Sequence, residues 1–134
     1  MYLEVLFMNK HTASYGPLLL RLVLGALFLV TGITKLLNPA IPTGMLTNIG
    51  FPAPGAFAWI LLLSEILFGL AVLLGYNIKL VVWPLVLVLV VATGLVYLPG
   101  FSKNIVTILF HLLGIAALAS LSLTGSGAFS VTKD

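Results

Sequence analysis

Four apolar runs, each long enough to cross a bilayer, occupy most of this 134-residue chain. A membrane-spanning helix needs about 20 mostly apolar residues, and we expect such helices at 17–37, 56–75, 78–98 and 104–123. In lipid, the backbone must satisfy its own hydrogen bonds, which favours helices. The runs therefore predict an all-α polytopic membrane protein, an antiparallel bundle of four transmembrane helices.

The composition supports a bilayer environment. Of the residues, 61% are hydrophobic and 7% are charged, whereas an average soluble domain has about a quarter charged. The net charge of +3 comes from six scattered basic residues, so we expect the lipid bilayer, and not nucleic acid, as partner. The chain contains no cysteine, which excludes disulfides and thiolate metal sites within it.

The connections between the runs differ in length. Residues 75–77 and 99–102 form short, Gly- and Pro-containing turns, which predict antiparallel neighbouring helices. Residues 38–55 form a longer connection with four prolines. Non-helical backbone at membrane depth must be covered by protein or line a cavity, so we expect a short interfacial or re-entrant segment and a pocket mouth here. Its apolar residues are Met45, Leu46, Ile49 and Phe51.

We divide the chain into an N-terminal segment at 1–16, a transmembrane domain at 17–123 and a polar C-terminal tail at 124–134. For the first nine residues two alternatives stay open: Leu3 to Phe7 is a remnant of a protease site added for expression, or the segment lies on the membrane surface. The positive-inside rule favours cytoplasmic termini in a prokaryotic cell membrane. Lys10, Arg21, Lys79 and Lys133 lie on one side, and Lys35 and Lys103 on the other.

Glu65 lies near the middle of the second apolar run. A carboxylate at that depth costs about 2.5–3.5 kcal/mol, so we expect a partner inside the bundle. Spacings of three and four residues place one basic and glycine-containing stripe on the first helix, opposite a second stripe. We expect the stripes to face each other, with Glu65 engaged by Arg21 or Lys35. The stripes are Arg21, Gly25, Phe28, Gly32 and Lys35, and Glu65, Gly69 and Val72.

Other polar residues fall in the same half of the membrane as Glu65. The helical rise of 1.5 Å per residue places His111, Thr31, Thr93 and Ser64 there, which predicts an intramembrane polar cluster. The cluster is either a ligand or proton site, or a buried ion pair that only fixes helix register, with His111 a hydrogen-bonded core residue. Trp59, Trp83 and Tyr97 are typical of interfacial belts.

Metal-dependent and hydrolytic chemistry have little support in the sequence. Only two histidines occur, and His11 lies outside the apolar runs, so bis-histidine haem ligation is not expected. We find no Ser-His-Asp set, no phosphate-binding glycine loop and no second buried carboxylate. We therefore expect no catalytic residues, no metal and no covalent cofactor, and a bound quinone or lipid remains the alternative.

The ordered set of motifs resembles the DoxX family of small membrane proteins. The resemblance rests on LLLRLVLGALFLVTGITKLLNP (18–39), NIGFPAP (48–54) and LLSEILFGLAVLLGY (62–76), and extends over about 18–123. It implies a four-helix membrane fold. It also implies an association with redox enzymes, because relatives include subunits of thiosulfate:quinone and quinol oxidoreductases. Distant animal relatives are assembly helpers for membrane receptors.

Three functions follow as hypotheses. The first is an accessory subunit of a quinone-linked oxidoreductase, without a cofactor of its own, whose polar pocket binds a quinone or another lipophilic small molecule. The second is a non-catalytic scaffold or assembly factor that docks another membrane protein or a second copy of itself. The third and least favoured is a small-solute transporter, because no inverted repeat is visible.

Overall fold

The computed structural model describes the backbone of residues 2–132 and the side chains of residues 15–132. Its helices are α1 (Tyr2–Leu37), α2 (Ala40–Asn48), α3 (Pro54–Leu74), α4 (Ile78–Ala92) and α5 (Phe101–Thr124). A π-helical turn, η1 (Thr93–Tyr97), and a 3₁₀ turn, η2 (Leu98–Gly100), join α4 to α5. The part of the chain that is described is therefore all-helical, as the apolar runs predict.

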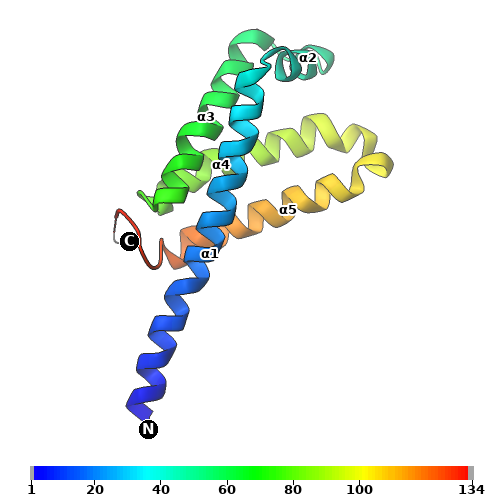
Figure 1. Cartoon of the computed structure of the whole chain (residues 1–134). Coiled ribbons are helices and arrows are strands. Elements are labelled where there is room, and N and C mark those ends of the chain that lie inside the picture. Colours follow the sequence, from blue (N-terminus) through cyan, green and yellow to red (C-terminus); the bar gives the residue numbers. More distant parts are fainter. Residues whose placement is uncertain (1, 133–134) are drawn as a thin grey trace.

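The helices form two pairs that diverge from each other. In Figure 1, α1 and α3 lie side by side, and α4 and α5 form a hairpin that leans away from them. The short helix α2 lies across the far end of the α1–α3 pair. The two pairs meet at the open end of the hairpin, where α4 begins and α5 ends. A core cluster joins them there, formed by Leu24, Phe28, Val72, Val82, Leu85, Leu118 and neighbouring residues.

Three helical stretches are long and apolar enough to cross a membrane: Tyr15–Leu37, Pro54–Leu74 and Ile78–Thr124. Large apolar side chains cover their outer surface; Leu37 is 81% exposed and Leu123 is 86% exposed. In water such exposure would be unfavourable, whereas lipid solvates these side chains. The chain is therefore an integral membrane protein. Because α4 continues through η1 and η2 into α5, residues 78–124 form one continuous helical stretch of 47 residues.

The expected helix ends need two corrections. Pro17 does not occupy a first helical position, because α1 begins at Tyr2 and Pro17 lies inside it. The expected turn at 99–102 is present, because the chain reverses between α4 and α5 (Figure 1), but its residues stay helical: Pro99 and Gly100 belong to η2, and α5 begins at Phe101, three residues before the expected start at 104. Proline and glycine are accommodated there by the tighter 3₁₀ turn. The two alternatives for the first nine residues, a protease-site remnant or a segment on the membrane surface, depend on side chains that lie outside the described ones at 15–132.

The connection at 38–55 contains the expected short helix. Met45 and Leu46 lie in α2, whereas Ile49 is its C-terminal cap and Phe51 follows it. The rings of Phe51 and Phe57 meet edge to face, with centroids 4.8 Å apart, and this contact joins the connection to the start of α3. Phe51 thus packs against the start of α3 instead of extending away from it.

Candidate functional site: a cleft with an ion pair and a histidine

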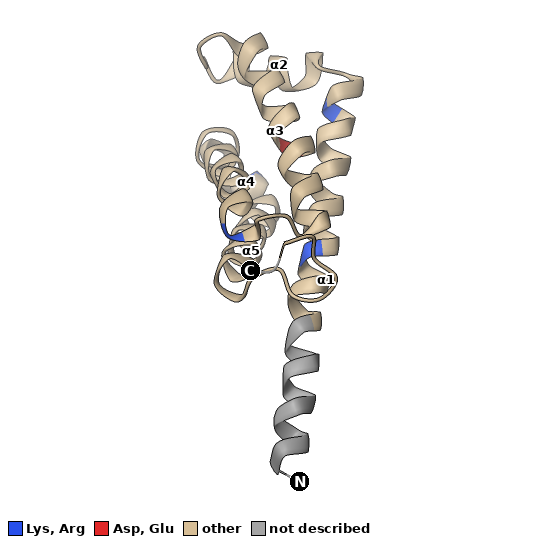
Figure 2. Ribbon diagram, turned by 90° about the vertical axis from the view of Figure 1, so that its left-hand side faces the viewer, with Lys and Arg blue, Asp and Glu red and all other residues tan. Residues whose placement is uncertain are grey.

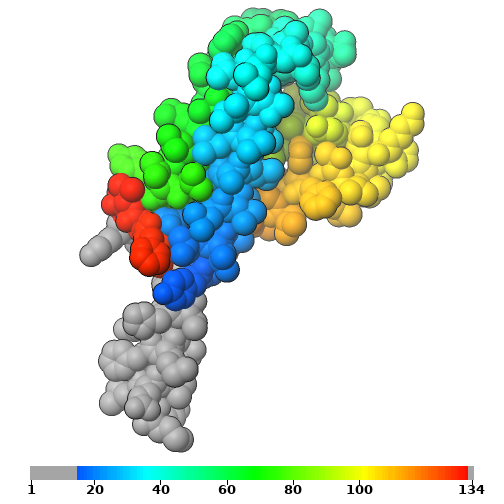
Figure 3. Space-filling view, in the orientation of Figure 1, coloured from blue at the N-terminus to red at the C-terminus, as the bar shows by residue number. Residues whose placement is uncertain are grey.

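A cleft of about 990 Å³ opens where the two helix pairs diverge. Helices α1 and α3 form one wall, α4, η1 and α5 form the other, and α2 lies at one end. Figure 3 shows the surface hollowed between α1 and the α4–α5 hairpin. The lining is mostly apolar, and its polar or charged side chains are Thr31, Lys35, Ser64, Glu65, Tyr97, Thr107 and His111.

An ion pair lies on the α1–α3 wall. Lys35 Nζ donates to Glu65 Oε2 over 2.7 Å. Glu65 is 4% exposed and is the only acidic residue among those with described side chains (Figure 2). Arg21 and Lys35 are the two partners that we expect for Glu65 from the sequence, and the structure pairs Glu65 with Lys35. Thr31 lies on the same helix, and its hydroxyl donates to the carbonyl of Phe28 over 3.1 Å.

Glycines let α1 and α3 approach closely enough for this pair to form. A Cβ atom at Gly25 would lie 2.7 Å from the backbone nitrogen of Leu73, and one at Gly32 would lie 3.2 Å from Glu65 Cβ. A Cβ atom at Gly69 would lie 3.0 Å from Phe28 Cβ. A Cβ contact under 3.0 Å requires an atom to shift, and one at 3.0–3.4 Å requires the neighbour to move by a few tenths of an ångström, so all three glycines lie in the close seam between the helices.

His111 lies on the opposite wall, on α5. Its Nδ1 is 3.0 Å from the Thr93 hydroxyl at the start of η1. The Tyr97 ring meets the His111 ring edge to face, with centroids 5.0 Å apart and an interplanar angle of 89°. The π-helical turn adds one residue to the usual helical turn, and such turns often occur at functional sites. The sequence indicates Tyr97 only as an interfacial belt residue, because a tyrosine near a helix end is typical of that belt, and it gives no sign of this contact with His111.

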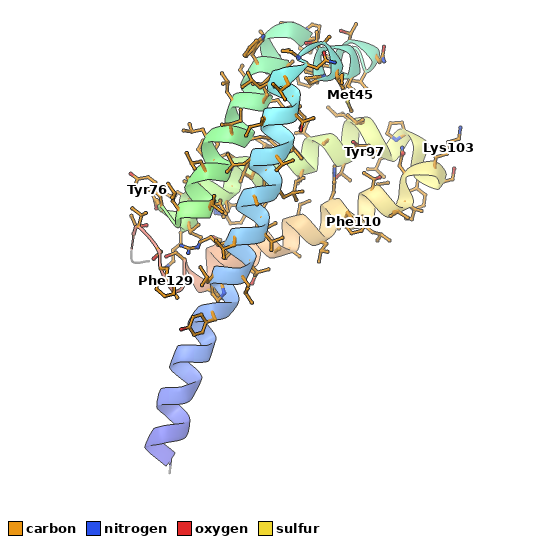
Figure 4. The ribbon with its side chains drawn as sticks, viewed as in Figure 1. Met45, Tyr76, Tyr97, Lys103, Phe110 and Phe129 are labelled. Atoms are coloured by element: carbon orange, nitrogen blue, oxygen red, sulfur yellow. The ribbon has the colours of Figure 1, made fainter. Side chains whose placement is uncertain are left out.

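Helix α2 covers the end of the cleft near these residues. Pro42, Met45, Leu46 and Ile49 contribute apolar surface to the lining. In Figure 4, Met45 points from α2 toward the end of the hairpin that carries Tyr97. The 38–55 connection thus lines one end of the cleft, in the region where we expect a pocket mouth from the sequence.

Arg21 does not belong to the cleft. It lies 14 positions before Lys35, which is about 21 Å along a helix, and it is level with the end of α3. Its Nη2 donates to the carbonyls of Ala128 over 2.9 Å and Phe129 over 3.1 Å. Arg21 is 1% exposed, and a Cβ atom at Gly75 would collide with its Nη1. The alternative in which Arg21 engages Glu65 is therefore wrong.

The residues after α5 fold back over Arg21 as a strap, which we define as residues 126–132. The backbone nitrogens of Val131 and Thr132 donate to the carbonyls of Leu74 and Gly75 over 3.0 and 3.2 Å. The Thr132 hydroxyl accepts from the backbone nitrogen of Asn77 over 2.7 Å. The strap thus binds the 75–77 turn. Its polar composition suggests a solvated tail, and no sequence pattern indicates this docking.

The cleft offers few but distinct chemical groups. Lys35 supplies hydrogen-bond donors, Glu65 supplies acceptors, and His111 supplies one of each in its neutral form. No group of three or more metal-ligating side chains occurs among the described residues. The arrangement can hold a mostly apolar molecule and orient its polar atoms from both walls.

Comparison with known proteins gives one match. The family model described as DoxX matches residues 16–98, more than half of the chain. The matched region includes α2, α3, α4, η1 and most of the candidate span in α1, and it contains Lys35, Glu65 and Tyr97. It ends before α5, which carries His111. No curated protein and no solved structure matches the chain.

Proposed function

The chain belongs to the DoxX family, and on that premise we propose that it binds a quinone or a similar lipophilic ring compound in the cleft. We propose further that it does so as an accessory subunit of a quinone-linked oxidoreductase. The family match shows that the chain is a membrane protein of the DoxX family. The support for the proposed ligand comes from the cleft itself. Its size, its apolar walls and the placement of its polar groups are the relevant features.

The observation that carries the proposal is the combination of the Lys35–Glu65 pair and His111 in one apolar cleft. Ligand pockets have volumes of about 300–1,000 Å³ and contain a few placed polar groups within apolar walls. The cleft has a volume of about 990 Å³ and fits that description. Lys35 can donate to a ring oxygen while it remains paired with Glu65, because an ammonium group has three protons.

Electron transfer is assigned to a partner protein in this proposal. The chain has no cysteine and two histidines, so it offers few ligands for a redox metal centre. The exposed apolar faces of the helices provide surface on which a membrane protein partner, or a second copy of the chain, could pack. The role of the chain would then be to hold the quinone next to the electron carrier of the partner.

The topology that we propose has four membrane crossings. Helices α4 and α5 would cross separately, because the chain reverses between them (Figure 1). Four crossings place both termini on one side, and the distribution of Lys and Arg favours the cytoplasmic side of a prokaryotic cell membrane. The cleft would then open near the opposite surface, where α2 lies.

Mass spectrometry of the organic extract of the detergent-purified protein tests the proposed ligand. We expect a quinone to be retained in proportion to the protein. Glu65→Gln should lose most of it, because the variant removes the charged partner that holds the Lys35 ammonium group in position to donate to the ring oxygen. Lys103→Gln provides a matched control, since Lys103 is exposed and is not part of the cleft lining. Equal quinone content in Glu65→Gln and wild type, or none in either after incubation with ubiquinone, would contradict the proposal and favour the scaffold alternative.

A further inference from the structure

The hydroxyl group of Thr93 fixes the hydrogen-bonding role of His111. Thr93 is 9% exposed, and its hydroxyl donates to the carbonyl of Leu89 over 2.6 Å. A hydroxyl group has one proton to donate. In the hydrogen bond of 3.0 Å between Thr93 Oγ1 and His111 Nδ1, the imidazole ring must therefore be the donor and the hydroxyl oxygen the acceptor. The Nδ1 atom of His111 carries a proton.

The other ring nitrogen is then an acceptor. A neutral imidazole carries one proton, so protonation at Nδ1 leaves a lone pair at Nε2. A neutral ring is expected, because a second positive charge is unfavourable in an apolar cleft that already holds the Lys35 ammonium. Within residues 15–132, the hydrogen bond at Nδ1 is the one that His111 makes through its ring, and none joins Nε2 to another group. The edge-to-face contact with Tyr97 restricts rotation of the ring.

The facing wall offers the opposite function. Lys35 Nζ uses one proton for Glu65 Oε2, and the side chain is 26% exposed in the cleft lining. Its remaining protons are available to a ligand oxygen. Both side chains line the cleft, so one wall supplies a donor at Lys35 and the other supplies an acceptor at His111 Nε2.

We propose that this pairing makes the cleft selective for the reduced, hydroxylated form of a ring lipid, the quinol, over the oxidised quinone. This inference rests on the proposed function. A quinol oxygen both donates and accepts hydrogen bonds, so it can donate to His111 Nε2 while the second oxygen accepts from Lys35. A quinone has only acceptor oxygens, and one of them would face the lone pair of Nε2. Thr93 is thus a positioning residue that sets the preference through His111.

The protonation of His111 can be measured without any ligand. In ¹⁵N-histidine-labelled protein carrying His11→Gln, the two nitrogen chemical shifts of His111 report which atom carries the proton. We expect a protonated Nδ1 and an unprotonated Nε2 in wild-type Thr93, and a changed pattern in Thr93→Val, which removes the acceptor. Protonation at Nε2 in the Thr93 protein would overturn the inference and leave the proposed ring-binding function intact.

The preference is measured as the ratio of dissociation constants for decyl-ubiquinone and decyl-ubiquinol under anaerobic conditions. One hydrogen bond contributes about 0.5–1.5 kcal/mol, so the wild type is expected to bind the quinol about two- to twelvefold more tightly. In Thr93→Val the ratio should fall toward one, with quinone affinity changed less than threefold. Thr93→Ser retains a hydroxyl group and should keep the preference, as should Thr34→Val, which removes a hydroxyl group outside the cleft lining that likewise donates to a carbonyl four residues earlier.

The outcomes separate the two proposals. Binding of both forms with equal affinity, or tighter binding of the quinone, would overturn the preference while supporting a ring-binding cleft. Failure of the wild type to bind either form would contradict the proposed function as well. Retention of the preference in Thr93→Val would show that Thr93 does not set the role of His111.

Discussion

The ammonium group of Lys35 lies 2.7 Å from Glu65 Oε2 and joins the last turn of α1 to the middle of α3. The two side chains differ in environment, because the Glu65 side chain is 6% exposed and that of Lys35 is 26% exposed. Both side chains line the cleft, but the carboxylate depends on this single cation, whereas the more exposed ammonium group keeps protons for a ligand. The pair both stabilises the α1–α3 seam and supplies the polar end of the cleft.

Removal of Lys35 should destabilise the protein more than removal of the Glu65 charge does. Lys35→Met leaves a buried carboxyl group without its donor, and such a loss costs about 1–3 kcal/mol. In the double variant Lys35→Met/Glu65→Met most of the loss should be recovered, because an apolar pair can replace a buried ion pair. Thermal unfolding in detergent of the wild type, Lys35→Met, Glu65→Met and the double variant measures the coupling as a double-mutant cycle. Additive losses in the double variant would show that the pair is not coupled.

Substitution in the glycine seam should separate α1 from α3. A Cβ atom at Gly25 would lie within 2.7–2.8 Å of the backbone nitrogen and Cα of Leu73, and the backbone cannot yield as a side chain does. We expect Gly25→Ala to cost about 1–3 kcal/mol in reversible unfolding. Gly16→Ala is the matched control, since no atom lies within 4 Å of its Cβ position. Equal stability of the two variants would contradict the close approach of the helices.

Loss of the Arg21 guanidinium should release the strap. Arg21→Met removes both hydrogen bonds to the carbonyls of Ala128 and Phe129 and leaves those carbonyls without this donor. Hydrogen exchange of the backbone amides of Val131 and Thr132 measures the effect, because both bond to the end of α3. We expect faster exchange in Arg21→Met and unchanged exchange in Lys79→Met, a control at an exposed position. Unchanged exchange in both would show that Arg21 does not hold the strap.

Much of the helix pattern can be predicted from the sequence, because membrane helices are specified by local composition. Apolar length alone predicts α3 within two residues at its start and one at its end. Gly75 marks the end of α3 because its φ of +73° lies in the left-handed region that favours glycine. By contrast, Pro17 indicates a helix start only where no earlier turn exists, and the structure extends α1 before it.

The candidate site can be predicted only in part. Helical spacing groups Lys35 and Glu65 on facing stripes, but spacing on one helix does not decide whether Arg21 or Lys35 is level with Glu65. That choice depends on how α1 and α3 are aligned, and the glycine contacts fix it at Gly25 with Leu73 and Gly32 with Ile66. The η1 turn and the strap depend on tertiary packing, so no local pattern predicts the contact of Thr93 with His111 or of Arg21 with Phe129.

A cleft-filling substitution tests the central claim most directly, namely that the space between the two helix pairs binds a lipophilic ring. Ala92 lines the cleft and is half-buried, whereas Ala116 is exposed and does not line it. The dissociation constant of decyl-ubiquinol is measured for Ala92→Phe and for the matched variant Ala116→Phe, with thermal unfolding as a check on folding. We predict that Ala92→Phe weakens binding at least tenfold and that Ala116→Phe binds as the wild type does. Equal affinity of a folded Ala92→Phe and the wild type would contradict the claim.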